Sequence, residues 1–192
     1  MGRGGTVPGG APASFPAAAT HVVGGLAPLV DRDWSVPAGE LAWSCRETVG
    51  HLVDCLLSYT LQVAARRAGD WLPVGEAHVA AGATPPDLLA TLGAVSTTFS
   101  AVLATAPPAT TASDGVVSLG VDDWAARGAY ELLVHGYDIA FGLGGTVHPP
   151  SAICAWILSS PNLWMLDRSR ATPGAGPWER LLLASGRAAP SA

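Results

Sequence analysis

Apolar residues recur at the spacing of an α-helix along most of this chain, and the pattern predicts four main helices. We expect the first over residues 15–30. The second begins at the sequence Ser44-Cys45-Arg46-Glu47, which is typical of a capping box, and runs to about residue 68. The third is expected over residues 84–104, and the fourth, which is the longest, over residues 121–143.

Shorter elements are expected between and after these helices. Residues 109–120 are rich in Thr, Ser and Gly and predict a loop, with room for a short extended piece at Val116-Val117. A fifth helix fits residues 151–158, with a continuation past Pro161 left open, and residues 177–187 form a short amphipathic piece. No long stretch alternates with period two, so the sequence predicts an all-α, four-helix bundle with long connections and a short C-terminal helix.

Length and composition favour one domain. The chain has 192 residues, of which 49% are hydrophobic and 13% charged, and this supplies a sizeable core. We expect residues 14–187 to form a single domain. The Gly- and Pro-rich residues 1–13 and the short stretch 188–192 are expected to be tails.

Charge and cysteine usage argue against several classes of protein. The net charge of −5, with no Lys, leaves no basic stripe for a nucleic acid. Pro, Ser and Thr interrupt the long uncharged stretches, so we expect neither a membrane-spanning helix nor a secretory signal. Cys45, Cys55 and Cys154 form neither an even set nor a CxxC pair, so reduced thiols and a cytoplasmic location are expected.

Three polar side chains share one face of the fourth predicted helix. Glu131 and His135 are four residues apart and Asp138 is three further along, so all three fall within about 60° on the helical wheel. A carboxylate and an imidazole one turn apart can both reach one divalent cation. A third protein ligand must then come from another helix, and His51 in the second helix is the expected donor.

His51 lies on a polar stripe of the second predicted helix. Cys55, Ser58 and Gln62 lie within about 40° of it on the wheel, whereas the apolar residues lie on the other side. The surroundings of Glu131 also favour a cation, because an unpaired carboxylate in a largely apolar helix is costly. Without a metal, this carboxylate would instead pair with the neighbouring histidine in the core.

Four segments carry a resemblance to a known family. They are Asp33-Trp34, residues 41–54 (LAWSCRETVGHLVD), residues 131–140 (ELLVHGYDIA) and residues 177–182 (PWERLL). Together they resemble the mycothiol-dependent maleylpyruvate isomerase family, which belongs to the DinB-like four-helix bundles, and the similarity extends over about residues 15–187. The resemblance implies a divalent metal, usually zinc, held by the residues that stand here as His51, Glu131 and His135.

The resemblance also implies thiol chemistry. The isomerase uses mycothiol, the low-molecular-weight thiol of actinobacteria, and related bundles are regarded as thiol S-transferases. A cation that keeps an open position deprotonates a bound thiol, which then becomes a nucleophile at neutral pH. We therefore expect a transferase or isomerase that joins a small-molecule thiol to a small electrophile, with zinc favoured over nickel or iron.

Alternatives remain open at this stage. The isomerase has an additional C-terminal domain that helps to complete its active site, whereas this chain ends at Ala192, so we expect a substrate other than maleylpyruvate. A non-catalytic metal-binding or metal-stabilised bundle, monomeric or homodimeric, would close the site with a fourth ligand such as Cys55 or Asp138. Asp138 would otherwise orient a ligand imidazole. The remaining candidates are assigned structural or surface roles: Glu47, Asp54, His21, His78 and His148.

Overall fold

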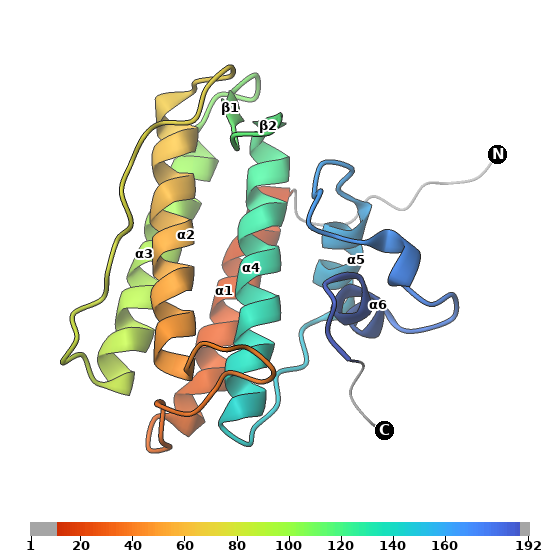
Figure 1. Cartoon of the computed structure of the whole chain (residues 1–192). Coiled ribbons are helices and arrows are strands. Elements are labelled where there is room, and N and C mark those ends of the chain that lie inside the picture. Colours follow the sequence, from red (N-terminus) through yellow and green to blue (C-terminus); the bar gives the residue numbers. More distant parts are fainter. Residues whose placement is uncertain (1–10, 189–192) are drawn as a thin grey trace.

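Four long helices lie side by side in the computed structural model, which describes residues 11–188 (Figure 1). They are α1 (Ala11–Leu26), α2 (Cys45–Ala65), α3 (Pro85–Thr105) and α4 (Val121–Gly142). Two shorter helices, α5 (Ser151–Ser159) and α6 (Pro177–Ala184), pack on each other beside α4. The remaining elements are two 3-10 turns, η1 (Ala27–Leu29) and η2 (Arg168–Arg170), and two strands, β1 (Thr111–Ser113) and β2 (Ser118–Gly120). The predicted all-α, DinB-like bundle is confirmed.

Reciprocal capping boxes fix the starts of α2 and α3. The Ser44 hydroxyl accepts a hydrogen bond from the Glu47 backbone N–H, and the Glu47 carboxylate accepts one from the Ser44 N–H at 2.7 Å. Thr84 and Asp87 make the same pair of bonds at the start of α3. Each box satisfies backbone donors that a helix leaves unpaired in its first turn, so the predicted starts of both helices are confirmed.

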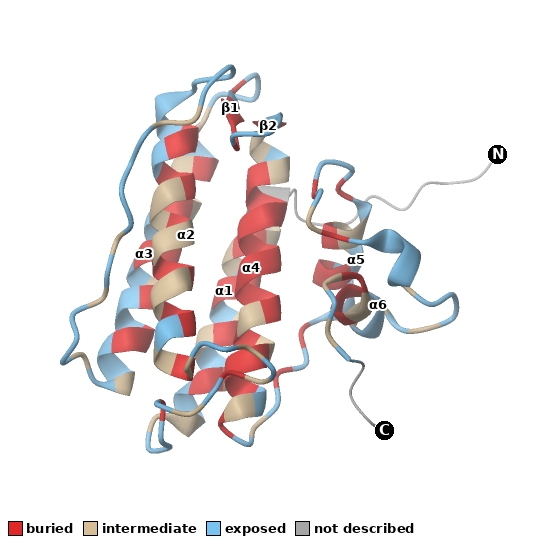
Figure 2. Cartoon of the chain, in the orientation of Figure 1, coloured by how far each residue is buried: buried red, intermediate tan, exposed pale blue. Residues whose placement is uncertain are grey.

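Helix α4 is the most buried helix and forms the centre of the molecule (Figure 2). Every residue from Trp124 to Val134 is buried. Gly136 allows α1 to approach closely, because a Cβ at this position would lie 2.7 Å from Cγ1 of Val22. The helix that carries two of the candidate ligands therefore lies in the interior, where polar atoms need hydrogen-bond partners.

Several boundaries differ from the sequence-based expectation. Helix α1 begins at Ala11, within the expected tail 1–13, whereas residues 1–10 and 189–192 lie outside the described residues. The extended piece expected at Val116-Val117 is wrong, because these residues form the turn between β1 and β2. The Asp114 carboxylate accepts hydrogen bonds from both of their backbone N–H groups and so stabilises the turn. Helix α5 ends at Ser159, before Pro161, so the continuation is not formed.

One connection is bound along the outside of α2. Residues 66–84 run beside α2 and α3, and two side chains of α2 hold them there (Figure 1). Gln62 exchanges two hydrogen bonds with the backbone of Leu72, at 2.8 and 3.1 Å. Asp54 accepts a bond of 2.7 Å from the Ala77 N–H, so its structural role is confirmed.

Among the helices of residues 11–188, α3 is long and apolar enough to cross a membrane by length and composition alone. The sequence pattern predicts no such helix, because Pro, Ser and Thr interrupt the long uncharged stretches. The core helix of a soluble protein meets the same criterion, and α3 packs against α1 and α2 through buried residues such as Leu92 and Phe99. A single helix of this kind is a weak indication of membrane insertion.

Candidate metal centre

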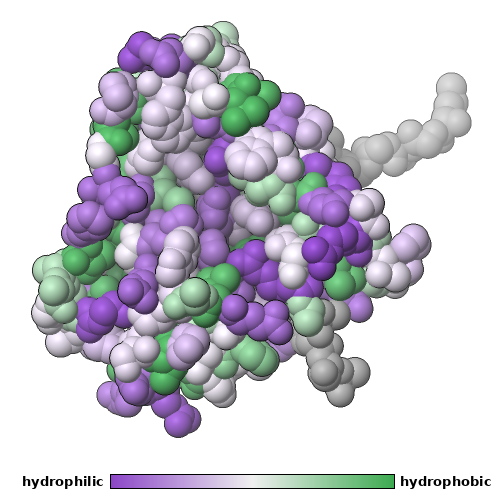
Figure 3. Space-filling view, in the orientation of Figure 1, coloured by the Kyte–Doolittle hydropathy of each residue, from purple (hydrophilic) through white to green (hydrophobic). Residues whose placement is uncertain are grey.

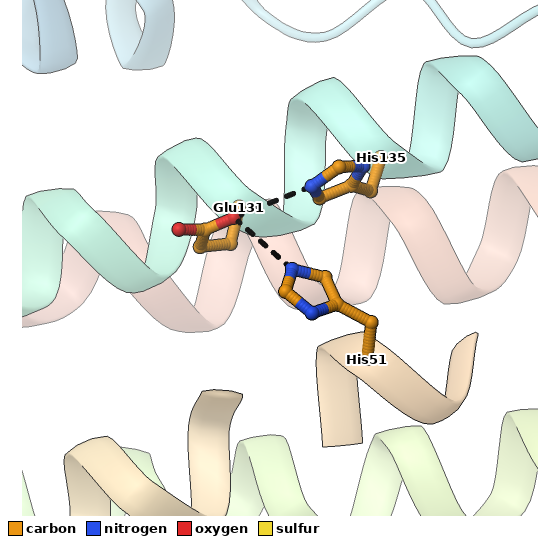
Figure 4. A group of neighbouring side chains, drawn as sticks. All are labelled: His51, Glu131 and His135. Atoms are coloured by element: carbon orange, nitrogen blue, oxygen red, sulfur yellow. Dashed lines mark ion pairs between the residues drawn. The ribbon is translucent and has the colours of Figure 1, made fainter. Parts of the chain in front are cut away.

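His51 from α2 meets Glu131 and His135 from α4 at the interface between the two helices (Figure 4). One donor atom of each residue lies within 4.8 Å of the other two. Glu131 Oε2 lies 3.5 Å from His135 Nε2 and 4.0 Å from His51 Nε2. The structure thus brings together the three side chains named from the sequence, and their role as metal ligands stays a prediction.

The donor set fits a divalent cation. Atoms that bind zinc tetrahedrally at about 2.0–2.1 Å lie about 3.3 Å from one another. The separation between Glu131 and His135 is close to this value, and that between Glu131 and His51 exceeds it by less than an ångström. The two imidazole nitrogens lie within 4.8 Å of each other, so the side chains would draw together around a bound cation. Two imidazoles and one carboxylate are ligands that zinc accepts, and three protein ligands leave a fourth position free.

Asp138 holds the other ring nitrogen of His135. Its Oδ2 lies 3.1 Å from His135 Nδ1, and Glu131 Oε2 faces the Nε2 of the same ring. Burial opposes the charge of His135, but the two carboxylates outweigh it and raise the pKa of the imidazole. When the ring loses a proton to bind a cation through Nε2, the bond to Asp138 retains the proton on Nδ1. Burial opposes the charge of Asp138, but hydrogen bonds from His135 and Arg187 outweigh it and keep the pKa of the carboxyl below its usual value. Of the two roles left open for Asp138, the geometry supports orientation of the imidazole.

Glu131 is held from its other side by Tyr59. The Tyr59 hydroxyl donates to Glu131 Oε1 at 3.1 Å and accepts a bond of 3.1 Å from Arg127 Nε. Burial raises the pKa of Glu131, but the two histidines and Tyr59 outweigh it and lower the pKa below the usual value. The carboxylate is therefore ionised and available to a cation.

The residues behind Glu131 were missed at the sequence level. Arg127 is buried, and its guanidinium forms an ion pair with Asp114, whose side chain is fully buried. The sequence does hint at the role of Arg127, because this residue lies one turn before Glu131 on the same face of α4, where the two charges can interact. No local pattern points to Tyr59 or Asp114 as partners.

His51 is the most accessible of the three candidate ligands. Its side chain is 31% exposed, against 12% for His135, and its ring packs against Trp43 with centroids 4.9 Å apart. Burial and the neighbouring His135 lower the pKa of His51. The imidazole is therefore neutral at neutral pH, which is the form that binds a metal.

Cys55 lies beside the site without joining it. Its Sγ is 3.5 Å from His51 Nε2, but it is not part of the group of three converging donors. Burial and the Glu131 carboxylate raise the pKa of this thiol to about 12. All three cysteines of the chain are free, so Cys55 is a neutral thiol next to His51.

A cavity of about 360 Å³ opens next to His51. Trp43, Arg46 and Asp54 line it together with residues 76–81. Of the three candidate ligands, His51 alone reaches its wall. Figure 3 shows hydrophilic side chains in a hollow between α2 and α4. A small polar molecule could therefore approach the centre from the side of His51.

The other histidines lie away from this centre. His78 is exposed and is 3.8 Å from the exposed Glu76. His148 is exposed, and His21 is a partly buried residue of α1. None of them belongs to the group of converging donors, as expected.

Residues 15–140 match one protein family, described as the mycothiol maleylpyruvate isomerase N-terminal domain. The match covers about two thirds of the chain and includes all three candidate ligands. Helices α5 and α6 lie after its end. No curated protein and no solved structure matches the chain.

Proposed function

The chain belongs to the family of the mycothiol maleylpyruvate isomerase N-terminal domain, and from this membership we propose that it is a metal-dependent enzyme of thiol chemistry. His51, Glu131 and His135 would bind the divalent metal, with zinc favoured and nickel or iron suited to the same ligands. The observation that carries the proposal is the convergence of three donor atoms within 4.8 Å beside an open cavity.

The proposed reaction is attack of a small-molecule thiol, such as mycothiol, on a small electrophile. A cation at this site would lower the pKa of a bound thiol, so that the thiolate is present at neutral pH. The protein's own groups would prepare the site: Asp138 would retain the proton on Nδ1 of His135 while Nε2 binds the cation, and Tyr59 holds the Glu131 carboxylate. The cavity next to His51 would admit thiol and electrophile. The proposal places the protein in the cytoplasm, where thiols are kept reduced.

One observation favours a second candidate function. The Sγ of Cys55 lies 3.5 Å from His51 Nε2, so this thiol is a candidate for a fourth ligand if its side chain moves toward Glu131 and His135. Metal coordination deprotonates a thiol even when its pKa in the metal-free protein is high. A site with four protein ligands would be closed, and the protein would then be a metal-stabilised bundle without catalysis.

Metal content tests the site directly. Plasma mass spectrometry on protein purified without a His tag should find about one zinc, nickel or iron per chain. Glu131→Gln should lose this metal, and the exposed His148→Ala serves as the matched control that keeps it. Absence of stoichiometric metal, even after divalent cations are added back, would overturn the proposal.

Cys55→Ser separates the two candidate functions. In an open site the variant binds metal as tightly as the unmodified protein, and a thiol added to the zinc-loaded protein loses protons on binding, which can be measured as acid release. In a closed site the variant binds metal more weakly, and the unmodified protein releases no protons when the thiol is added. Circular dichroism should confirm that each variant keeps its helical content.

A further inference from the structure

The segment after α4, residues 143–188, contacts the hydrogen-bond network around the candidate centre at two separate points. It contains α5, η2 and α6 and lies beside α4, outside the residues matched to the family (Figure 1). One point of contact is Arg187, just after α6, and the other is Trp164, after α5. Each leads by hydrogen bonds to a different ligand of the proposed metal.

Arg187 contacts the residue that orients His135. Its Nη2 and Nε donate to the two carboxylate oxygens of Asp138, at 2.7 and 3.3 Å. The guanidinium is itself held in place, since Nη1 donates to the Ser185 carbonyl at 2.9 Å. Asp138 is 3% exposed, and its Oδ2 also faces His135 Nδ1. A bidentate pair of hydrogen bonds fixes the plane of the carboxylate and, through it, the orientation of the His135 imidazole.

Trp164 leads to Glu131 on the opposite side of the centre. Its indole N–H donates to Asp114 Oδ2 at 2.8 Å, and the same oxygen accepts from Arg127. Arg127 donates to the Tyr59 hydroxyl, which donates to Glu131. The Arg127 guanidinium also lies 5.1 to 5.8 Å from the ring centroids of Tyr59, Trp124 and Trp164.

We propose that Arg187 and Trp164 are positioning residues, through which the C-terminal segment holds both α4 ligands in the orientation that a metal requires. This inference rests on the proposed metal site. Without Arg187, Oδ1 of the buried Asp138 carboxylate loses its donor and Oδ2 keeps only His135. Asp138 then gains freedom to turn toward a second cavity of about 410 Å³ that it lines. His135 then loses the partner that fixes its tautomer and ring orientation.

Zinc affinity, measured by competition with a chromogenic chelator, tests the proposal on the full chain. Arg187→Gln should weaken binding about 10–100-fold, which is the usual effect of losing such a partner. Trp164→Phe keeps the ring but loses the donor, and its loss of affinity should lie between that of Arg187→Gln and the controls. Arg187→Lys keeps the positive charge but not the bidentate geometry, so its zinc affinity should lie between that of Arg187→Gln and that of the unmodified protein.

Two matched controls lie in the same segment. Arg180 is exposed in α6, and its side chain bonds to no residue among those described, so Arg180→Gln should change affinity by no more than about twofold. The buried indole N–H of Trp178 has no hydrogen-bond partner in the described structure, so Trp178→Phe should behave likewise. Visible absorption of the cobalt-substituted protein should change for Arg187→Gln and Trp164→Phe and stay constant in both controls.

Nitrogen-15 NMR of His135 in metal-free protein, at alkaline pH where the imidazole is neutral, separates this inference from the proposed function. We expect the Nδ1–H tautomer in the unmodified protein and a mixture of tautomers in Arg187→Gln. If no variant binds zinc but the tautomer still responds to Arg187→Gln, the proposed function fails and the positioning role of Arg187 stands. If Arg187→Gln and Trp164→Phe change neither the zinc affinity nor the tautomer of His135, the positioning role is overturned. This holds whether or not the protein binds metal.

Discussion

The Tyr59 hydroxyl donates to Glu131 Oε1 at 3.1 Å and so joins α2 to α4 two turns from His51 and one turn from His135. The bond lies in the interior, since Tyr59 is 4% and Glu131 9% exposed. It leaves Oε2, the oxygen that faces both imidazoles, free of this donor. One carboxylate thus serves two purposes, because Oε1 belongs to the structural network and Oε2 to the candidate metal centre.

Tyr59→Phe should lower the free energy of unfolding by about 1–3 kcal/mol, because it leaves Arg127 Nε and Glu131 Oε1 without a buried partner. Urea denaturation monitored by circular dichroism measures the change. Tyr137→Phe is the matched control, since the Tyr137 hydroxyl bonds to no described residue and its removal should cost less than about 0.5 kcal/mol. Equal stability of the two variants would contradict the role given to Tyr59.

Asp114→Asn should destabilise the protein by about 3–5 kcal/mol at neutral pH, because it removes one partner of a buried ion pair. Burial opposes the charge of Asp114, but bonds from Val117, Trp164, Val116 and Arg127 outweigh it and lower the pKa of the carboxyl. A lowered pKa means that the stabilisation is fully present above the pKa of the unfolded chain, about 3.9. It is lost as the pH falls through the lower pKa of the folded state.

Urea denaturation at several pH values checks this dependence. The difference in stability between the unmodified protein and Asp114→Asn should be constant from neutral pH down to about pH 4 and should shrink below it. Asp70→Asn is the control, since Asp70 pairs with Arg67 on the surface and its loss should matter little at any pH. If the difference in the free energy of unfolding does not shrink in acid, Asp114 stabilises the protein through packing and neutral hydrogen bonds and not through its charge.

Local patterns predicted the metal-ligand candidates, but the network behind them depends on long-range contacts. Glu131 and His135 share a helix at a spacing that shows in the sequence, and His51 stands on the one polar stripe of its helix. The network on the other side of Glu131 joins α2, α4, the turn before β2 and the segment after α5. Spacing carries no information about which distant segments meet, so Tyr59 and Trp164 could not be assigned from the sequence alone.

The hairpin and the C-terminal contacts escaped prediction for the same reason. Strand pairing between Thr111 and Gly120 is too short to leave an alternating pattern, and the Asp114 carboxylate stabilises the intervening turn. Arg187 looked like an ordinary residue after a short amphipathic helix. Its importance depends on Asp138, which lies 49 residues earlier in the chain. Asp138 itself was recognised, but the sequence left open whether it binds the metal or orients His135, and its 3.1 Å contact with His135 Nδ1 supports the orienting role.

Gly136→Ala should destabilise the bundle by about 1–3 kcal/mol, because the added Cβ would lie 2.7 Å from a methyl group of Val22 and α1 would have to move away. Gly93→Ala in α3 is the matched control. A Cβ there meets no atom within 4 Å, so the higher helix propensity of Ala should stabilise this variant, by up to about 1 kcal/mol. Guanidinium denaturation of both variants should therefore give changes of opposite sign, and the same sign for both would contradict the close approach of α1 and α4.

Zinc should stabilise the folded chain, because the two helices that supply the ligands separate on unfolding. At a free zinc concentration of about 100 times Kd the gain is about 2.7 kcal/mol. For a protein of this size each kcal/mol raises Tm by about 2–4 °C, so we expect a rise of about 5–11 °C that a chelator reverses.

Glu131→Gln should abolish this rise in Tm, and His148→Ala should preserve it, because the exposed His148 lies outside the group of converging donors. The comparison must be made as a difference between zinc-loaded and chelator-treated samples of each variant, since Glu131→Gln also weakens the bond with Tyr59 and shifts Tm without metal. Differential scanning calorimetry of the two samples gives both Tm values for each variant. An equal rise in Glu131→Gln would mean that zinc binds elsewhere on the protein, and the three converging side chains would then be no more than a buried ion-pair cluster.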